Sequence, residues 1–256
     1  MALVYLEKWH GGGNDFLVDV VEQGAAPWWN AARARALCDR HRGVGADGFI
    51  LATVGSEVGM TLYNADGSLA EMSGNGVRCL AAAVRRATHA TWTTLDVHTS
   101  AGVRGVRLEM QSEDTGYGSV AMGAVTFGKP LEGTLGTAFV GNPHVVVRDD
   151  PSWSDAAREE MAAAWAEKVG GANVEFVTVL DSARVRARVI ERGVGWTLAC
   201  GTGACAIAAV LNRDGDVGTT VVVENPGGEL TVTLTGADAT LAGPVQFVGN
   251  VEWLAV

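Results

Sequence analysis

ADGSLAEMSGNGVRCLAAAV, residues 65–84, is a glycine-rich turn that leads directly into an alanine-rich helix, with Ser73 at the junction. ACGTGACAIAAVL, residues 199–211, has the same form, with Cys200 at the matching position. In both, a small, Gly, polar, Gly, small pattern is followed by Leu or Ile and two alanines. The two junctions lie 127 residues apart, about half of the 256-residue chain. This internal repeat predicts two similar halves, each with a helix that begins at a glycine.

The sequence around these helices is mostly strand-like. Eight segments rich in Val and Thr show partial alternation, which indicates strands; they are MTLYN at 60–64, TTLDVHT at 93–99, GVRLEM at 105–110, HVVVRD at 144–149, VEFVTVL at 174–180, RVRARVI at 184–190, TTVVVEN at 219–225 and ELTVTLT at 229–235. Further helices are predicted at 28–41 and 154–169, where Ala, Arg and Glu dominate. The fold class is therefore α+β, with a mainly antiparallel sheet around a central helix in each half.

Composition and charge exclude several classes of protein. An apolar content of 48% supports packed cores, and the net charge of −10 without a basic run makes nucleic acid an unfavoured partner. The longest apolar stretch, 198–211, is shorter than the ~20 residues that cross a bilayer. The N-terminus lacks a basic region followed by an apolar core. We therefore expect a soluble, cytoplasmic protein with no membrane partner.

The spacing and order of residues argue against several other kinds of functional site. The four cysteines show no CxxC pair and no histidine at zinc spacing, so we expect no metal site and no disulfide framework. The residues around Ser73 do not form the Gly-x-Ser-x-Gly motif of a serine hydrolase. GVGADG, from Gly43, matches a dinucleotide fingerprint, but it follows a predicted helix and leads into a strand-like segment, which is the reverse of the required order.

Paired helix starts suit one particular reaction. The start of a helix leaves N–H groups unpaired and carries partial positive charge, so it attracts anions, and glycines let a ligand approach the backbone. If the halves face each other, both starts can bind one carboxylate, with residues 73 and 200 on opposite sides of the adjacent carbon. Inversion of a stereocentre needs that arrangement of base and acid. Cys200 suits the role because a helix start lowers the pKa of a thiol, whereas Ser73 needs a neighbouring base.

Six blocks resemble, in family order, the signature blocks of the diaminopimelate epimerases. They are KWHGGGNDF at 8–16, DRHRGVGADG at 39–48, YNADGSLAEMSGNGVRC at 63–79, GNPHVVV at 141–147, NVEFV at 173–177 and ERGVGWTLACGTGACA at 191–206. The resemblance implies two pseudo-symmetric domains, for which we predict bounds of 1–125, joined by the strand 246–256, and 126–245. It also implies a homodimer without a cofactor that interconverts LL- and meso-diaminopimelate, a small amino-acid substrate of lysine and cell-wall synthesis.

The resemblance also implies roles for individual residues. Cys200 and Ser73 take the two catalytic positions. The substrate-binding residues expected from the matched blocks are Asn14, which orients the substrate; Asn64, Asn142, Asn173 and Arg192, which hold its distal end; Glu191, beside an ammonium group; and the backbone of Gly74, Asn75, Gly201 and Thr202, which holds the reacting carboxylate. His144 is expected to support the site.

Two positions depart from the family pattern. The family has a catalytic Cys where this chain has Ser73, and usually a Glu where it has Trp196. Three interpretations of Ser73 follow: an epimerase that the serine impairs, a divergent homologue that performs a one-base isomerisation or β-elimination on another amino acid, or an amino-acid-binding protein without catalysis. Trp196 either fills core space or reshapes the pocket.

Overall fold

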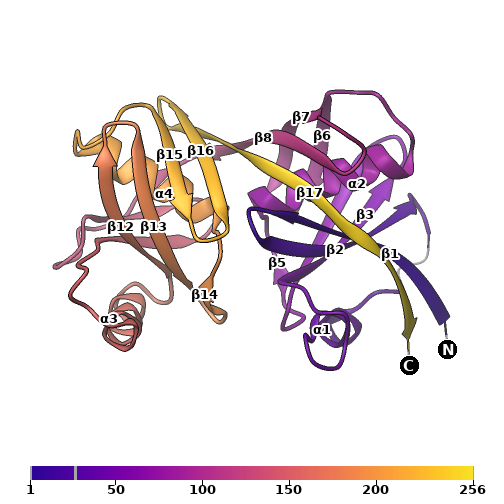
Figure 1. Ribbon diagram of the computed structural model, residues 1–256, viewed down its shortest axis with the longest axis horizontal. Helices are drawn as coiled ribbons and strands as arrows, with labels where there is room; N and C mark the ends of the chain where they lie inside the picture. Colours follow the sequence, from indigo (N-terminus) through magenta and orange to yellow (C-terminus); the bar gives the residue numbers. More distant parts are fainter. Residues whose placement is uncertain (1, 26–27, 256) are drawn as a thin grey trace. The chain divides into compact units, whose positions relative to one another are not determined.

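The computed structural model describes residues 2–25 and 28–255, and positions 1, 26, 27 and 256 lie outside the described residues. The chain divides into two compact units (Figure 1). Unit 1 extends to Val120 and also contains the chain from Gly243, whereas unit 2 is Ala121–Ala242. The last strand, β17 (Asp238–Ala255), begins in unit 2 and ends in unit 1.

Unit 1 is a curved sheet around one helix. Its strands pair in the order β17, β1, β2, β3, β4, β6, β7, β8. In this order the pairs β2–β3 and β4–β6 are parallel and the other pairs are antiparallel. The strand bounds are β1 Ala2–Gly11, β2 Asn14–Glu22, β3 Gly48–Val54, β4 Val58–Asn64, β5 Leu69–Ala70, β6 Thr94–Thr99, β7 Gly102–Met110 and β8 Thr115–Ala124.

Unit 2 repeats this pattern of strand pairing. Its strands pair in the order β10, β11, β12, β13, β15, β16, β17, and the pairs β11–β12 and β13–β15 are parallel. Counted from β10 they are the second and fourth pairs, as β2–β3 and β4–β6 are when unit 1 is counted from β1. The strand bounds are β9 Thr126–Phe127, β10 Gly136–Phe139, β11 Pro143–Arg148, β12 Asn173–Asp181, β13 Arg184–Glu191, β14 Gly195–Thr197, β15 Thr220–Asn225 and β16 Gly228–Thr235. The repeat predicted from the two glycine-led helices is confirmed, and the chain has the expected α+β fold.

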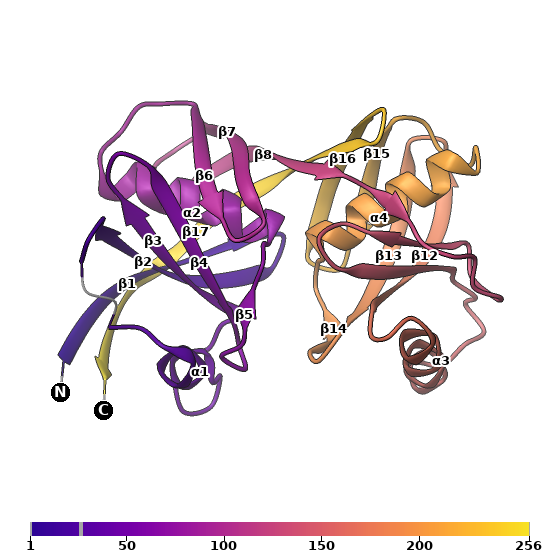
Figure 2. The same ribbon diagram turned by 180° about the vertical axis from the view of Figure 1, so that it is seen from behind.

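The central helices are α2 (Gly74–Ala87) in unit 1 and α4 (Gly201–Arg213) in unit 2, each enclosed by strands (Figure 2). Runs of alanine give each helix a narrow surface, so strands can pack against several of its sides, and most of both helices is buried. Ser73 caps α2 and Cys200 caps α4, each accepting a hydrogen bond from the N–H three residues later. The residues at the two junctions therefore have the same local role.

The outer helices are α1 (Ala31–Cys38) and α3 (Asp155–Lys168). Both helices fall inside the predicted segments. Helix α1 is shorter than the predicted 28–41, because Asn30 caps its start and the backbone becomes extended at Asp39. Apolar clusters lie under them; the cluster under α3 includes Val145, Val174 and Phe176. Within the described parts of the chain, no helix is both long and apolar enough to span a membrane.

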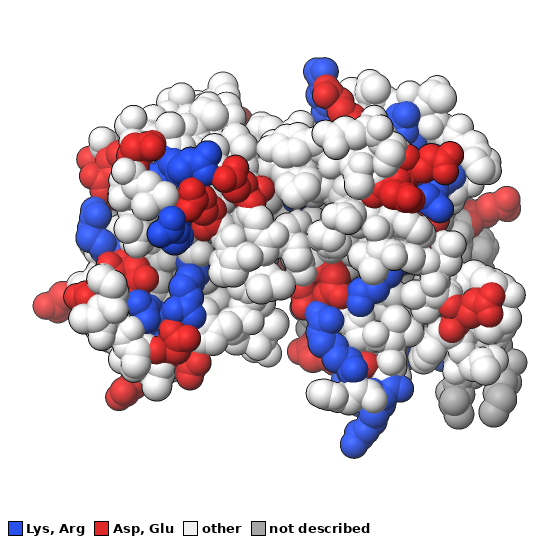
Figure 3. All heavy atoms as spheres, viewed as in Figure 1, with Lys and Arg blue, Asp and Glu red and all other residues white. Residues whose placement is uncertain are grey.

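Charged side chains of both signs are interspersed on the face in Figure 3. In unit 2, ion pairs join neighbouring strands, as Arg184 of β13 pairs with Glu224 of β15 at 2.9 Å. Such exposed pairs contribute little to stability. This face therefore has a mixed charge pattern.

Candidate active site

In unit 1 the candidate site residues gather at the start of α2. Ser73 is partly exposed, and its hydroxyl accepts a hydrogen bond from the N–H of Gly76 at 3.1 Å. In this arrangement Ser73 is a helix cap whose oxygen stands at the positive end of a fourteen-residue helix. Among the described residues of unit 1, no general base is hydrogen-bonded to the Ser73 hydroxyl, so within this unit it has the chemistry of an ordinary alcohol.

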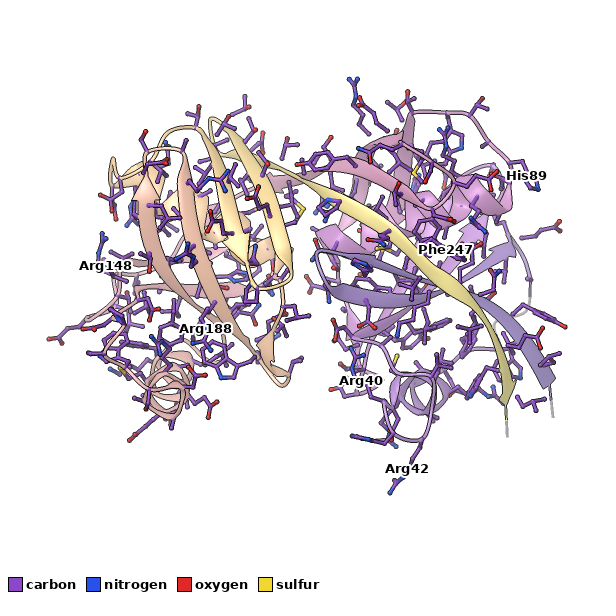
Figure 4. The ribbon with its side chains drawn as sticks, in the orientation of Figure 1. Arg40, Arg42, His89, Arg148, Arg188 and Phe247 are labelled. Carbon is purple, nitrogen blue, oxygen red and sulfur yellow. The ribbon has the colours of Figure 1, made fainter. Side chains whose placement is uncertain are left out.

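A network of hydrogen bonds holds the side chain of Asn75, the second residue of α2. The Asn75 amide donates to Asn14 Oδ1 at 3.2 Å and accepts from the buried guanidinium of Arg78 at 2.7 Å. Asn14 in turn donates to Asp47 Oδ2 at 2.9 Å. Arg40, labelled in Figure 4, pairs with the same Asp47 at 2.8 Å. The predicted residues Asn14 and Asn75 thus belong to one network, whereas sequence analysis did not identify Asp47 or Arg78.

The side chain of Asn64 makes its hydrogen bond outside that network. It ends β4, and its amide donates to the hydroxyl of Ser68 at 3.0 Å in the turn that follows. It is partly exposed. Within unit 1 it therefore has the geometry of a turn residue whose amide is accessible to a ligand.

In unit 2 the candidate site residues gather at the start of α4. Cys200 is only 6% exposed. Its sulfur accepts from the N–H of Gly203 at 3.3 Å and lies 3.4 Å from the hydroxyl of Thr202. The amide of Asn173 donates to it at 3.8 Å. Hydrogen-bond donors around a thiol at a helix start favour its thiolate form.

The pKa of the Cys200 thiol is nevertheless raised well above its ordinary value. Burial is the largest cause, and the negative charges of Glu191 and Glu175 add to it. The hydrogen bonds from Thr202 and Gly203 oppose this rise without offsetting it. The expectation that a helix start lowers this pKa was therefore wrong in the ligand-free protein, because burial and two carboxylates outweigh the helix. In this state the thiol keeps its proton.

Side chains of β12 alternate between the sheet face toward α4 and the face toward α3. Val174 and Phe176 join the cluster under α3, so Asn173 and Glu175 lie on the opposite face, toward α4. The contact of Asn173 with the Cys200 sulfur agrees with this placement. His144 pairs with Asn173 in the parallel register of β11 and β12 and lies on the same face. One face of this sheet therefore carries the polar side chains around Cys200.

His144 connects two of those side chains. Its Nδ1 lies 2.6 Å from Oε1 of Glu175, and its Nε2 lies 2.8 Å from Oδ1 of Asn142. The side chains of His144 and Glu175 are 0% and 1% exposed. The predicted supporting role of His144 thus has a concrete set of contacts, and Glu175, inside the quoted NVEFV block, is a site residue that sequence analysis did not identify.

Glu191 and Arg192 lie at the end of β13. The carboxylate of Glu191 accepts from the hydroxyl of Thr197 at 2.6 Å, and it is close enough to Cys200 to affect its thiol. Arg192 is exposed, and its backbone N–H donates to Asn173 Oδ1 at 2.9 Å. Its guanidinium is thus available at the surface beside this set of residues.

Trp196 lies on the α3 face of the sheet. It pairs in register with Ile190, which packs with the cluster under α3. Its indole N–H donates to Glu159 at 2.7 Å, and the guanidinium of Arg188, labelled in Figure 4, lies 4.1 Å from the ring centroid. Of the two interpretations of Trp196, the structure supports space filling, because the side chain packs on the face opposite the one that carries Cys200's neighbours.

Comparison with known proteins gives one consistent family. The family model described as diaminopimelate epimerase matches residues 7–128 and 136–248. The diaminopimelate epimerase of Xanthomonas euvesicatoria pv. vesicatoria (strain 85-10) is 37% identical, covering 96% of this chain and 95% of the relative. The diaminopimelate epimerase of Synechocystis sp. (strain ATCC 27184 / PCC 6803 / Kazusa) is also 37% identical, covering 98% of this chain and 100% of the relative.

Solved structures show the same fold at lower identity. A predicted epimerase from Pseudomonas aeruginosa superimposes with a TM-score of 0.78 at 16% identity, covering 99% of this chain and 100% of that one. A hydroxyproline epimerase from Agrobacterium vitis gives a TM-score of 0.74 at 17% identity, covering 98% of this chain and 92% of that one. At these identities the likeness concerns the fold alone.

Proposed function

Since the chain belongs to the diaminopimelate epimerase family, we propose that it interconverts LL- and meso-diaminopimelate by proton transfer at one α-carbon. The observation that carries the proposal is the pair of matching helix starts, with Ser73 capping α2 and Cys200 capping α4. The curated relatives with nearly full-length similarity bear the name of this activity.

The backbone N–H groups at both helix starts would bind the reacting carboxylate. Those of Gly74, Asn75, Gly201 and Thr202 point along helices whose starts attract anions. A base removes the α-hydrogen as a proton, and the electron pair stays on the α-carbon, stabilised by the bound carboxylate. An acid then delivers a proton to the opposite face. The reaction thus requires that positions 73 and 200 both reach this carbon when substrate is bound.

Because burial raises the pKa of the Cys200 thiol, the proposal gives Cys200 the role of acid in the resting enzyme. To act as a base it must first lose its proton, and an ammonium group of the substrate beside Glu191 would reduce the repulsion that opposes this loss. The other substrate-binding groups in the proposal are those expected from the family blocks, namely Asn14, Asn64, Asn142, Asn173 and Arg192, with His144 supporting them.

Ser73 makes the proposed enzyme slow. A hydroxyl ionises far less readily than a thiol, so one of the two proton transfers lacks its usual group, and such a group contributes a factor of about 10²–10⁴. Ser73 also favours a second candidate, a one-base isomerisation or β-elimination on another amino acid, because elimination needs no proton at the opposite face.

The proposal includes action in the cytoplasm, without pyridoxal phosphate or another cofactor, as a homodimer. Exposed apolar side chains on the β1–β17 pair support the homodimer, because such patches are typical of protein interfaces. Leu3, Tyr5 and Leu254 are 45%, 65% and 61% exposed. Leu3 and Leu254 are paired in register.

Hydrogen–deuterium exchange at the α-carbon tests the proposed function. Each diaminopimelate isomer is incubated separately with the protein in deuterated water, and deuterium at the α-carbon is followed by NMR. We expect exchange in one isomer to exceed that in the other, and Cys200→Ser to abolish it. Cys205→Ser is the matched control, because Cys205 lies on the same helix, is fully buried and does not cap it. Equal loss in both variants, or no exchange with either isomer, would contradict the proposal.

A further inference from the structure

Arg78 is a cation buried in the centre of unit 1. It lies on α2, which the strands of this unit enclose (Figure 2), and its side chain is fully buried. A guanidinium keeps its charge in a protein, and burial of a charge is unfavourable unless specific interactions compensate for it. The matching position in α4 is occupied by the buried thiol Cys205. Packing of a central helix in this fold therefore does not require an arginine.

Two strands leave room for the Arg78 side chain. A Cβ atom at Gly11, in β1, would lie 3.1 Å from Nη2 of Arg78, and a Cβ atom at Gly118, in β8, would lie 3.1 Å from its Cδ. Both distances are shorter than the optimal separation of about 3.5–4.0 Å between non-bonded carbon atoms. Glycine at these two positions thus accommodates the arginine in the core of unit 1.

The guanidinium holds two groups at the start of α2. Its Nη2 donates to Oδ1 of Asn75 at 2.7 Å, and its Nη1 donates to the carbonyl oxygen of Gly74 at 3.3 Å. The planar fork of an arginine suits two such acceptors better than the single ammonium of a lysine does. The other end of the Asn75 amide donates to Asn14 at 3.2 Å. Hydrogen bonds therefore fix this side chain at both ends.

The contact with Gly74 determines the direction of one N–H group. The carbonyl of Gly74 and the N–H of Asn75 belong to one planar trans peptide, in which they point in opposite directions. Because the oxygen is held toward Arg78, one turn further along the helix, the N–H points out of the helix start. The N–H of Gly76 is bonded to the Ser73 hydroxyl at 3.1 Å. Within the described part of the chain the N–H of Asn75 has no such partner, so it is available to a ligand.

From these contacts we propose that Arg78 is a positioning residue for the reaction. It fixes the peptide between Gly74 and Asn75, and it keeps the Asn75 side chain away from the helix start, where a released asparagine would bond to nearby backbone groups. Removal of the α-proton adds negative charge to the bound carboxylate, so a fixed N–H donor contributes more in the transition state than in the substrate complex. This role rests on the proposed function and adds to it a residue on which the rate depends.

Hydrogen exchange in the ligand-free protein tests the structural half of the proposal. Arg78→Lys keeps the charge and loses the fork, and NMR follows solvent exchange of the Asn75 side-chain amide. We expect exchange to be faster by about tenfold or more, the value of one hydrogen bond to a charged group. Val84→Ala is the packing control, because Val84 is buried further along the same helix, and it should leave this exchange unchanged. Unchanged exchange in Arg78→Lys would overturn the proposal.

Kinetics with diaminopimelate in deuterated water test the functional half. The rate of α-hydrogen exchange is measured against substrate concentration for the unsubstituted protein, Arg78→Lys, Arg78→Met and Val84→Ala. We expect both Arg78 variants to lower the maximal rate by about 10–100-fold and to raise KM by a smaller factor. The Val84 variant should change neither. A full rate in Arg78→Lys would show that the charge alone suffices, and a raised KM with an unchanged maximal rate would show that only binding is affected; either result would overturn the proposal.

Asn75→Ala keeps the proposal testable if an arginine variant does not fold. It retains the backbone N–H and removes one of the two groups that Arg78 holds. We expect a lower maximal rate, and we expect the double variant with Arg78→Lys to lose little more than Arg78→Lys alone, because both act on one contact. An unchanged maximal rate in Asn75→Ala would overturn the proposal. If none of the proteins exchanged the α-hydrogen, the proposed function would fail, and amide exchange in the ligand-free protein would still decide what Arg78 holds.

Discussion

Gly203→Ala tests the packing of α4 against the buried carboxylate. The added Cβ would lie 2.7 Å from Glu175 Oε1 and 3.2 Å from the Cys200 sulfur, so the carboxylate must move. Because it is held at 2.6 Å by His144, moving it breaks or distorts that contact. Loss of a buried hydrogen bond to a charged group costs about 1.5–3 kcal/mol, and alanine recovers up to about 1 kcal/mol through its helix propensity. We expect a net loss of about 0.5–2 kcal/mol.

Gly76→Ala is the matched control because Gly76 has the equivalent position in α2. Its Cβ would meet the methyl end of Met60 and the Cβ of Ser73 at 3.2 Å, and the flexible Met60 can adjust. We expect no loss of stability there. Urea denaturation gives both free energies of unfolding. Equal stability of the two variants would refute the reasoning, as would an undiminished loss for Gly203→Ala when Glu175 is also replaced by alanine.

Two further variants test the electrostatics and the sheet faces. Glu191→Gln should lower the pKa of the Cys200 thiol, because it removes a negative charge that disfavours the thiolate. A ¹³C NMR titration of labelled cysteine measures this pKa. Glu159→Gln, on the α3 face, is the control variant that should leave the pKa unchanged. Trp196→Glu should destabilise the protein by about 1–3 kcal/mol in urea, because it removes ring packing and places a carboxylate near Glu159. The same variant should give no gain in epimerisation, and a gain would show that Trp196 obstructs the pocket.

Local patterns in the sequence predict much of this fold. The paired SGNG and CGTG segments mark both central helices, because small residues at a helix start followed by alanines within the helix predict a buried helix. The eight predicted strand segments coincide with strands. The long strand β17 had no comparable signal, because it contains Gly243 and Pro244 and its two ends belong to different units. Such a strand forms through its pairing with strands that are distant in the sequence.

The sequence likewise predicts only some features of the candidate site. Motifs indicate His144 and Cys200, but the state of the thiol depends on burial and on carboxylates that come from other strands. Glu175 lies in a quoted block, yet its contact with His144 depends on the register of β11 and β12, which places both side chains on the same face of the sheet. The register of Trp196 with Ile190 likewise determines its face. Tertiary packing, which no local pattern records, determines these features.

Restoring the second thiol tests the central claim most directly, namely that proton transfer at positions 73 and 200 limits catalysis. The measurement is the rate of net epimerisation of LL-diaminopimelate by the unsubstituted protein and by Ser73→Cys under the same conditions. The account predicts that Ser73→Cys is faster by a factor of about 10²–10⁴, the contribution of one positioned acid or base. Equal rates in the two proteins would contradict the two-group mechanism, and no epimerisation by either would favour the divergent-substrate alternative.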